Sequence, residues 1–316
     1  MPRVRTSTTS STARSKTLRS LTRTGQALRC GRSASFQVSF RLTWDMRSMM
    51  STILASEPTP GQPDSFVDPK PPTYDLSYRD SFWPVRAYED RCDRIALRAL
   101  LPRSGGNLVD LGAGFGRLVG EYRAFASISL VDASPVMVYA ASERVAADPR
   151  CTVILANATD LPMTGDSVDA VVSVRLLVHL RDPEATFREV ARVLRTGGSL
   201  IVEFPNRRHL LARLRYRFRR QVWCPTDRQP HEYVPGHFAH HPRSIERQLR
   251  EAGLEPAKWR AVSLFRVAWL TSRVPAAILA AIERPLQGLF GRLAPGPSTY
   301  VRAIKSGSSA SSRGSS

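Results

Sequence analysis

An apolar run that leads directly into a glycine-rich turn is the feature of this sequence that most constrains its fold. Residues 109–116 read VDLGAGFG, which places three glycines within five positions. Glycines allow a backbone to pass close to a ligand, and a helix that follows such a turn points its N-terminal amides at whatever binds there. This segment therefore predicts a buried strand, a ligand-binding turn and a helix in succession.

The spacing of these glycines excludes the fingerprint of nicotinamide dinucleotide enzymes. That fingerprint is G-x-G-x-x-G, and its third glycine would fall on Arg117. Sixteen residues after Gly116, the next apolar run ends in Asp132, a carboxylate placed to accept hydrogen bonds from both hydroxyls of a ribose. The third run is followed by Asn157 and Ala158, where a side-chain amide and a backbone amide could bind the edge of an adenine.

Short apolar runs alternate with helical segments through the middle of the chain. The strands expected from these runs are Leu108–Leu111, Ile128–Val131, Thr152–Leu155, Val168–Val174, Leu200–Phe204 and Thr299–Ile304. Ser134 before Pro135 signals the start of a helix, and the apolar spacing from Phe187 to Leu194 predicts another helix that ends at Gly197. Strands that alternate with helices are typical of a parallel sheet covered on both faces.

Four motifs, in order over residues 105–206, resemble those of the class I S-adenosylmethionine-dependent methyltransferases, of the broad small-molecule group called type 11. The motifs are Val109–Gly116, Leu130–Ala133, Ala156–Pro162 with Ser167–Ser173 after it, and Phe187–Gly198. The resemblance implies an α/β, Rossmann-like fold, in which a seven-stranded, mostly parallel sheet has an antiparallel last strand, helices on both faces and a substrate-side insertion. It also implies an enzyme that uses S-adenosyl-L-methionine as its cofactor.

The same resemblance implies a cofactor site across the carboxyl ends of the strands. The cofactor-binding residues that it implies are Asp110, Gly112, Ala113, Gly114, Gly116, Asp132, Ala133, Asn157, Ala158, Val174 and Arg175. The glycines would approach the methionine portion, Asp110 would reach the methionine amine through water, and Asp132 would hold the ribose. Asn157 stands where the family usually has Asp, and its carbonyl oxygen can still accept a hydrogen bond from the adenine amine. Asp110 could instead only cap the turn, and Asp132 could only be an acid in the first turn of the next helix.

The reaction that the resemblance implies is in-line displacement at the sulfonium methyl, which alignment and exclusion of water can accelerate without a dedicated base. If the acceptor is a hydroxyl, His179 is the candidate catalytic base, because an unperturbed imidazole pKa of about 6.5 suits proton transfer. A packed or surface histidine explains His179 equally well. No metal is expected, because the run from His237 to His241 has no Cys or carboxylate at a spacing that would complete a site.

Acceptor recognition is expected outside the four motifs. An upstream aromatic cluster would either close over the cofactor or pack as a core helix, and its members are Tyr74, Tyr78, Phe82, Trp83 and Tyr88. Downstream, residues 207–241 are expected to form a cap or insertion, followed by a helix at Pro242–Ala252. The apolar segment Val262–Leu293 either lines a pocket for a hydrophobic acceptor, such as an isoprenoid, a polyketide or a lipid-linked molecule, or forms a helix pair packed on the sheet.

The basic charge of the chain is concentrated in two places. The 316 residues carry a formal net charge of +19, and residues 1–50 hold ten Lys and Arg against one acid. Residues 207–220 hold seven arginines and no acid, and the apolar side chains that fall on one face of a helix there are Leu210, Leu211, Leu214 and Phe218. Such a helix would contact an anionic membrane surface, an acidic substrate or RNA phosphates, or would form a solvated face that covers the core. Outside residues 1–50 and 207–220, the methyltransferase domain has nearly as many acidic as basic residues, so nucleic acid is not the expected partner.

The chain divides into three parts by composition. Residues 1–66 are expected to be a disordered extension, with a transit peptide, or translation from a later methionine at 46–50, as alternatives. Residues 67–305 form the expected methyltransferase domain, and residues 306–316 a disordered tail. The four cysteines show no pairing pattern, and the longest uncharged apolar stretch of the second half has nine residues. A cytoplasmic protein without a membrane span is therefore expected.

These features predict methyl transfer from S-adenosylmethionine to a small-molecule acceptor that is hydrophobic, natural-product-like or lipid-like. One alternative is an RNA methyltransferase. The enzymes that methylate base amino groups carry Asn/Asp-Pro-Pro-aromatic after the fourth strand, whereas residues 174–177 here are VRLL. The other alternative is a non-catalytic subunit that keeps the fold as a partner module.

Overall fold

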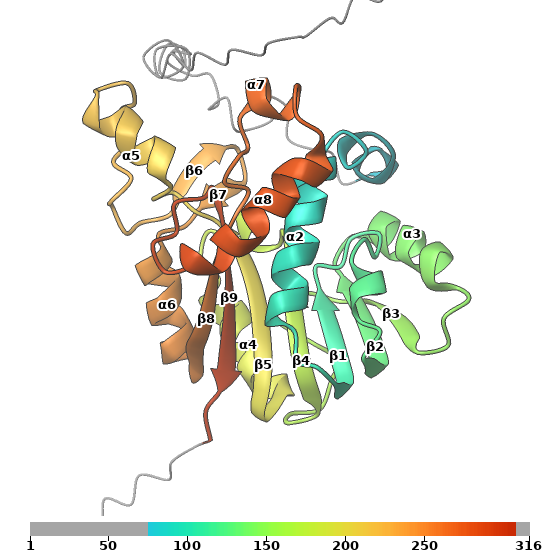
Figure 1. Ribbon diagram of the computed structural model, residues 1–316. Coiled ribbons are helices and arrows are strands. Elements are labelled where there is room, and N and C mark those ends of the chain that lie inside the picture. The colour runs from blue at the N-terminus through green and yellow to red at the C-terminus, as the bar shows by residue number, and fades with distance from the viewer. Residues whose placement is uncertain (1–74, 308–316) are drawn as a thin grey trace, which may run out of the picture. The chain divides into compact units, whose positions relative to one another are not determined.

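The computed structural model of this protein describes residues 75–307. The extension expected over residues 1–66 and residues 308–316 of the expected tail lie outside the described residues. The described part contains a seven-stranded sheet, a two-stranded sheet and the helices around them (Figure 1).

The large sheet has the topology that the sequence predicts. Its strands are β1 (Gly105–Leu111), β2 (Phe125–Asp132), β3 (Cys151–Leu155), β4 (Val168–Ser173), β5 (Leu194–Pro205), β8 (Leu254–Val262) and β9 (Ser298–Lys305). They are arranged in the order β3-β2-β1-β4-β5-β9-β8. Strands β1 to β5 pair in parallel, and β9 runs antiparallel to β5 and β8 on its two sides. The predicted mostly parallel sheet with an antiparallel last strand is therefore confirmed.

Helices cover both faces of this sheet, because its strands are apolar on both sides. Neighbouring residues of a strand point to opposite faces, and Leu108 and Val109 of β1 are each 1% exposed. Leu108 packs in the core that includes α2 (Ala87–Leu100) and α8 (Ala276–Leu289), which lie in front of the sheet in Figure 1. Val109 packs in the second core, with α4 (Glu184–Val193) and α6 (Pro242–Glu251).

Strand β8 is not predicted by the sequence patterns. In the described part of the chain it forms the edge of the sheet and pairs with β9 alone. Its ladder with β9 shifts register between Pro256 and Lys258, and its exposed positions include Glu255 and Lys258. An edge strand with polar positions and a register shift lacks the continuous apolar run that marks the central strands.

The prediction of a helix directly after the glycine turn is wrong. Residues 114–118 form successive turns, and only a short 3-10 helix, η2 (Val119–Glu121), follows before β2. The hydrogen bonds here join residues three apart, such as Val119 to Gly116 at 3.3 Å and Tyr122 to Val119 at 3.1 Å. Few residues separate the two strands, and Gly120 lowers the helix propensity further. The turn itself, rather than a helix N-terminus, therefore presents backbone amides at this place.

The helix expected to end at Gly197 ends four residues earlier. Helix α4 stops at Val193, and Leu194 already has extended dihedral angles and begins β5. The apolar position of Leu194 continues the helical spacing, but its side chain is buried as a strand residue opposite Val168. The double glycine thus lies within β5, where Gly197 has a φ of +77°.

The C-terminal apolar segment forms helices that pack on the sheet. After the short helix α7 (Ala268–Thr271), α8 runs from Ala276 to Leu289 and buries Leu279 and Ala280 against the core that contains α2. Of the two alternatives for this segment, the packed helices are the one observed. Within residues 75–307, no helix combines the length and the apolar character that a membrane crossing requires.

The expected insertion consists of one helix and a hairpin. Helix α5 (Leu210–Arg217) is followed by β6 (His231–Val234) and β7 (His237–Ala239), which form the two-stranded sheet. His240, just after β7, contacts the carbonyl oxygen of Leu177 through Nε2 at 3.0 Å, and its own carbonyl accepts a hydrogen bond from the amide of Arg207 at 3.1 Å. The hairpin is thereby fixed against the segment that follows β4.

The apolar face predicted for α5 does not pack on the core. The residues of α5 that are buried are Ala212 and Arg215, whereas Leu210 is 50% exposed and Phe218, at the end of the helix, is 52% exposed. The imidazole of His209 caps the helix by accepting a hydrogen bond from the amide of Ala212 at 3.2 Å. The small Ala212 and the long Arg215 face inward, Leu211 and Leu214 are half-buried, and Leu210 and Phe218 face solvent.

Candidate active site

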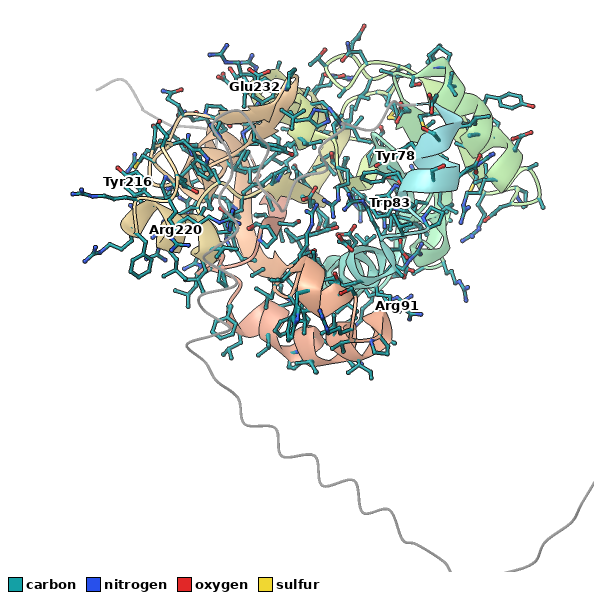
Figure 2. All side chains as sticks on the ribbon, turned by 90° about the horizontal axis from the view of Figure 1, so that it is seen from above. Tyr78, Trp83, Arg91, Tyr216, Arg220 and Glu232 are labelled. Carbon is teal, nitrogen blue, oxygen red and sulfur yellow. The ribbon has the colours of Figure 1, made fainter. Side chains whose placement is uncertain are left out.

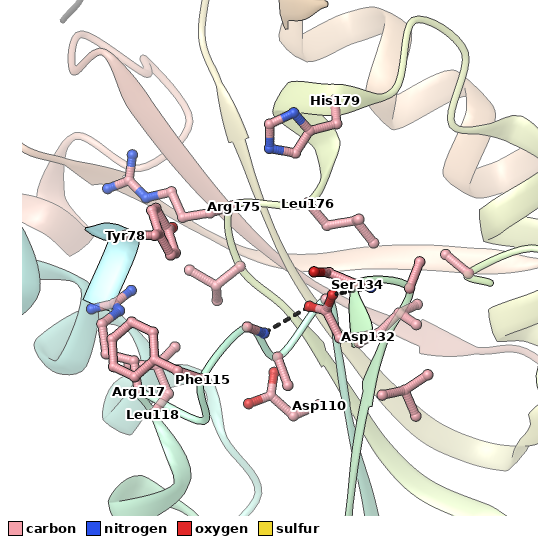
Figure 3. A pocket seen from close by; sticks show the side chains of 18 of the residues that line it. Tyr78, Asp110, Phe115, Arg117, Leu118, Asp132, Ser134, Arg175, Leu176 and His179 are labelled. Carbon is pink, nitrogen blue, oxygen red and sulfur yellow. Dashed lines mark hydrogen bonds between the residues drawn. The ribbon is translucent and has the colours of Figure 1, made fainter. Parts of the chain in front are cut away.

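A cavity of about 430 Å³ lies at the carboxyl ends of β1, β2 and β4 (Figure 3). The predicted site residues that line it are Asp110, Gly112, Ala113, Gly114, Asp132, Ala133, Asn157, Ala158, Val174, Arg175 and His179. Gly116 does not line it. A Cβ added at Gly116 would lie 3.5 Å from Leu130 and 4.0 Å from Ala141, so this glycine belongs to the packing beneath the turn. The structure thus brings three separate sequence motifs to one cavity.

The carboxylate of Asp132 is held by backbone amides on both of its oxygens. The amide of Gly114 donates to Oδ2 at 2.8 Å, and the amide of Ser134 donates to Oδ1 at 2.9 Å. Each oxygen has a further lone pair for a ligand hydroxyl. Ser134 is also the N-cap of α3 (Pro135–Val145), as predicted, and accepts a hydrogen bond from the amide of Met137 at 3.4 Å. Asp132 is therefore fixed in orientation at the mouth of the turn.

The turn needs glycine at its first position for two reasons. Gly112 has a φ of +74°, in the left-handed region where side chains are unfavourable. A Cβ at this position would also lie 3.0 Å from the Cβ of Leu176, which follows β4. The absence of a side chain therefore lets the loops after β1 and β4 approach each other at the cavity.

Asp110 lies at the base of the cavity and is 3% exposed. Burial raises the pKa of its carboxyl from 3.8 to about 7, although the Tyr122 hydroxyl, which donates a hydrogen bond at 2.9 Å, works in the opposite direction. A carboxyl with this pKa gains its charge near neutral pH, and a cation bound beside it would favour the ionised form. The arrangement suits the ammonium group of an amino acid moiety.

Asn157 lines the cavity, but its carbonyl oxygen is already used within its own turn. Oδ1 accepts hydrogen bonds from the amide and the hydroxyl of Thr159, both at 3.2 Å. The side-chain NH2 group is then the part of Asn157 that stays available to a ligand, and it is a donor. This differs from the expected contact, in which the carbonyl oxygen accepts from an adenine amine.

A buried ion-pair cluster that the sequence did not reveal borders the cavity. Asp93 of α2 is fully buried and contacts Arg117 Nη2 at 2.9 Å and Arg175 Nη2 at 3.3 Å. The guanidinium of Arg117 also lies 3.6 Å from the ring centroid of Trp83. Arg175 has a φ of +66°, and its amide donates to Glu203 at 3.0 Å. The cluster fixes two arginines on the wall of the cavity.

Aromatic side chains from the segment before α2 close one side of the cavity. Tyr78, in the π-helix η1 (Tyr78–Phe82), and Trp83 line it and meet edge to face, with ring centroids 6.0 Å apart. Tyr78 also contacts the ring of Phe115 in the glycine turn at 6.1 Å. Tyr88 instead lies in the core on α2 and donates a hydrogen bond to Glu283 of α8. The expected core packing is therefore found for Tyr88, and Tyr78 and Trp83 lie at the cavity where closure over the cofactor stays a prediction, while Tyr74 lies outside the described residues.

His179 lies at the end of the cavity away from Asp110 in the view of Figure 3. It ends the short 3-10 helix η3 (Leu177–His179), and its ring lies 4.9 Å from that of His237 in β7. Burial, and then the neighbouring His237, lower the pKa of His179 to about 4. The imidazole is consequently neutral at physiological pH and can accept a proton. Among residues 75–307, no group of three or more His, Cys, Asp or Glu side chains is placed to hold a metal ion.

Comparison with known proteins identifies the class of this domain. Residues 109–202 match the family model described as a methyltransferase domain. The demethylmenaquinone methyltransferase of Clavibacter sepedonicus is 31% identical over 150 residues, which are 45% of this chain and 58% of that protein. The demethylmenaquinone methyltransferase of Roseiflexus sp. (strain RS-1) is 29% identical over 189 residues, which are 56% of this chain and 78% of that protein. The first match thus spans less than two thirds of the relative's length.

A solved structure shares the fold. The complex between the Haloferax volcanii Trm112 methyltransferase activator and a methyltransferase matches with a TM-score of 0.51 and 20% identity, and covers 75% of this chain and 100% of that one. At this identity the likeness shows the fold alone. Together with the family match, it confirms the prediction from the four motifs: the chain contains a class I S-adenosylmethionine-dependent methyltransferase domain of type 11. The predicted cofactor is the one that this family uses.

Proposed function

We propose that this protein transfers a methyl group from S-adenosylmethionine to a small, hydrophobic acceptor. The observation that carries the proposal is the fixed carboxylate of Asp132 beside the glycine turn, in a cavity that also contains Asp110 and the segment at Asn157. Within one cavity these groups offer a hydrogen-bond acceptor for hydroxyl groups, a negatively charged partner for an ammonium group and a hydrogen-bond donor for the edge of an adenine. When bound, the cofactor supplies an electrophilic sulfonium methyl group.

The roles proposed for the binding residues follow from their contacts. Asp132 would accept hydrogen bonds from the ribose hydroxyls with the lone pairs that Gly114 and Ser134 leave free. Asp110 would carry its negative charge in the complex and attract the methionine ammonium group. The glycine turn would let the methionine portion approach the backbone, since Gly112 and Gly114 line the cavity without side chains.

The acceptor side of the cavity is proposed to lie among Tyr78, Arg175 and His179. Tyr78 offers an aromatic surface and excludes water, which favours in-line displacement by holding the reactants close. His179, neutral at physiological pH, would accept a proton from a hydroxyl acceptor, and its low pKa makes it a weak base. The aromatic side chain of Tyr78 on this side of the cavity would suit an aromatic or isoprenoid-like acceptor. The names of two relatives, which refer to demethylmenaquinone, support the same class of acceptor.

The experiment that tests this proposal is an acceptor screen with methyl-labelled S-adenosylmethionine. The full chain is incubated with quinols, phenols, isoprenoid alcohols and structured RNA, and label is counted in the organic and aqueous phases. We expect label in a hydrophobic product, and loss of that label in Asp132→Ala. Label only in RNA would favour the nucleic-acid alternative, and binding of cofactor with no product from any acceptor would favour the non-catalytic one.

A further inference from the structure

The outward surface of α5 and the loop after it exposes arginines and apolar side chains together. We define the α5 surface as the exposed part of residues 210–222. Its exposed arginines are Arg213, Arg217, Arg219 and Arg220, and its exposed apolar residues are Leu210, Phe218 and Val222. Val222 is 98% exposed. Tyr216 and Arg220 extend outward from this part of the molecule in Figure 2.

Among residues 75–307, no acid neutralises the exposed arginines of the α5 surface. Elsewhere on the protein, exposed arginines pair with carboxylates one helical turn away, such as Arg188 with Glu184 at 2.5 Å and Arg247 with Glu251 at 2.7 Å. Within the described part of the chain, the four exposed arginines of the α5 surface make no ion pair. Their charge is therefore available to an anionic partner.

A shallow groove runs along the same surface. Its lining residues include Leu214 and Pro225 together with Arg213, Arg217 and Arg219. A groove lined by both apolar and cationic residues suits a molecule with a negatively charged head and an apolar body. The whole α5 surface, like the groove, combines positive charge with exposed apolar side chains.

The positive charge of the α5 surface argues against two other occupants of the groove, namely residues 1–50 of the same chain and a second copy of the protein. Residues 1–50 of the chain hold ten Lys and Arg against one acid, and a second copy carries a net charge of +19, so both would be repelled by these arginines. A lipid bilayer with anionic headgroups offers negative charge together with an apolar interior. RNA offers phosphates, and its bases stack on aromatic side chains such as Phe218, but the aliphatic side chains of Leu210 and Val222 gain little from stacking.

We propose that the α5 surface docks the protein on an anionic lipid bilayer. Leu210, Phe218 and Val222 enter the boundary of the apolar layer, and the arginines contact lipid phosphates. Helix α5 follows the carboxyl end of β5, the same edge of the sheet at which the cavity opens. Helix α7, with Trp269 46% exposed, stands at this end as well (Figure 1). Docking would therefore bring the acceptor side of the cavity near the membrane, although the inference does not depend on methyl transfer.

Co-sedimentation of the full chain with vesicles tests the proposal. We expect binding to vesicles of phosphatidylcholine with phosphatidylglycerol, weaker binding at high salt, and no binding to phosphatidylcholine alone. The variant Arg217→Gln/Arg219→Gln should bind about 25-fold more weakly, at roughly fivefold for each arginine. Phe218→Ser/Val222→Ser should also weaken binding, although its charge is unchanged.

The matched control is Arg103→Gln/Arg123→Gln, which removes the same charge from exposed positions just before β1 and β2, at the opposite end of the sheet. It should bind the anionic vesicles within about twofold of the unaltered protein, since bilayer attraction falls off within a Debye length. Equal losses in the control and the α5 variants would overturn the proposal. So would binding to single-stranded RNA, lost in Arg217→Gln/Arg219→Gln, without binding to any vesicle.

Discussion

The backbone amide of Gly114 donates a hydrogen bond to the carboxylate of Asp132 at 2.8 Å, and this contact joins the glycine turn after β1 to the end of β2. The amide of Ser134 holds the other carboxylate oxygen at 2.9 Å. Two separate segments of backbone therefore fix this side chain. A ligand that uses Asp132 meets a group whose orientation the fold has already set, which reduces the entropy lost on binding.

The glycine turn can be tested by Gly112→Ala. We expect a loss of more than about 2 kcal/mol in the free energy of unfolding, because a left-handed residue with a Cβ costs roughly 1–2 kcal/mol and this Cβ would also press on Leu176. Urea denaturation measures the loss. Cofactor affinity should fall with it, since the turn borders the cavity.

Two glycines of the same chain serve as controls for this variant. Gly253 has a φ of +79° but open space around its Cβ, so Gly253→Ala should show the backbone strain alone. Gly120 has open space and no left-handed angle, so Gly120→Ala should be close to neutral. If all three variants lose the same stability, the close approach at Gly112 has no energetic importance.

The raised pKa of Asp110 predicts a pH-dependent stability. The folded-state pKa is about 7 and the ordinary value is 3.8, so between these values the folded protein holds a proton that the unfolded chain has lost. The stability from this group is greatest at low pH and decreases as the pH rises through 7. The free energy of unfolding of Asp110→Asn, relative to that of the unaltered protein, should therefore rise by about 3 kcal/mol between pH 5 and pH 8. Urea denaturation at both pH values gives the comparison, and an equal difference at both would refute the assigned pKa.

The ion-pair cluster predicts a large effect of Asp93→Asn. This change leaves Arg175 with a neutral partner and leaves Arg117 with Asp90 as its carboxylate, and removing one member of a buried pair costs roughly 3–5 kcal/mol. The comparison is Asp80→Asn, at a surface pair with Arg79 in which the aspartate side chain is 54% exposed, where we expect a much smaller loss because water screens the pair. Thermal unfolding of the two variants would contradict this account if it showed equal losses.

The proposed role of His179 predicts a loss of turnover without a loss of cofactor affinity. We expect His179→Ala to lower kcat by about 100-fold for a hydroxyl acceptor. Because the pKa of His179 is lowered to about 4, the acid limb of the pH–rate profile should lie near pH 4. His237→Ala removes a group that depresses this pKa and should move the limb upward. An unchanged kcat in His179→Ala would show that this histidine does not act as the base.

The sequence predicts the parts of the fold that are set by local pattern. Apolar runs locate the buried strands, and a carboxylate directly after the second of them locates Asp132 at the cavity. The sequence pattern predicts the wrong element or the wrong buried face where tertiary packing determines the structure. Leu194 continues a helical spacing but pairs in β5, and Leu210 of α5 is half exposed although it belongs to the predicted apolar face.

The ion-pair cluster could not be predicted, because it joins residues far apart in the sequence. Asp93 and Arg175 are 82 positions apart and meet only when α2 packs on the sheet. Arg117 is visible in the sequence only as the residue that breaks a dinucleotide fingerprint. The single signal that could have revealed the cluster is an acid at a position of α2 that otherwise faces the core, next to Cys92 and Ala96.

Calorimetric titration with S-adenosylmethionine tests the central claim most directly. We predict that the folded full chain binds the cofactor, and that Asp132→Ala and Asp132→Asn, shown to be folded by circular dichroism, bind it roughly 10-fold to 100-fold more weakly, as expected for lost hydrogen bonds to a charged group. Absence of binding at millimolar cofactor, or equal affinity in the unaltered chain and both variants, would contradict the proposed site.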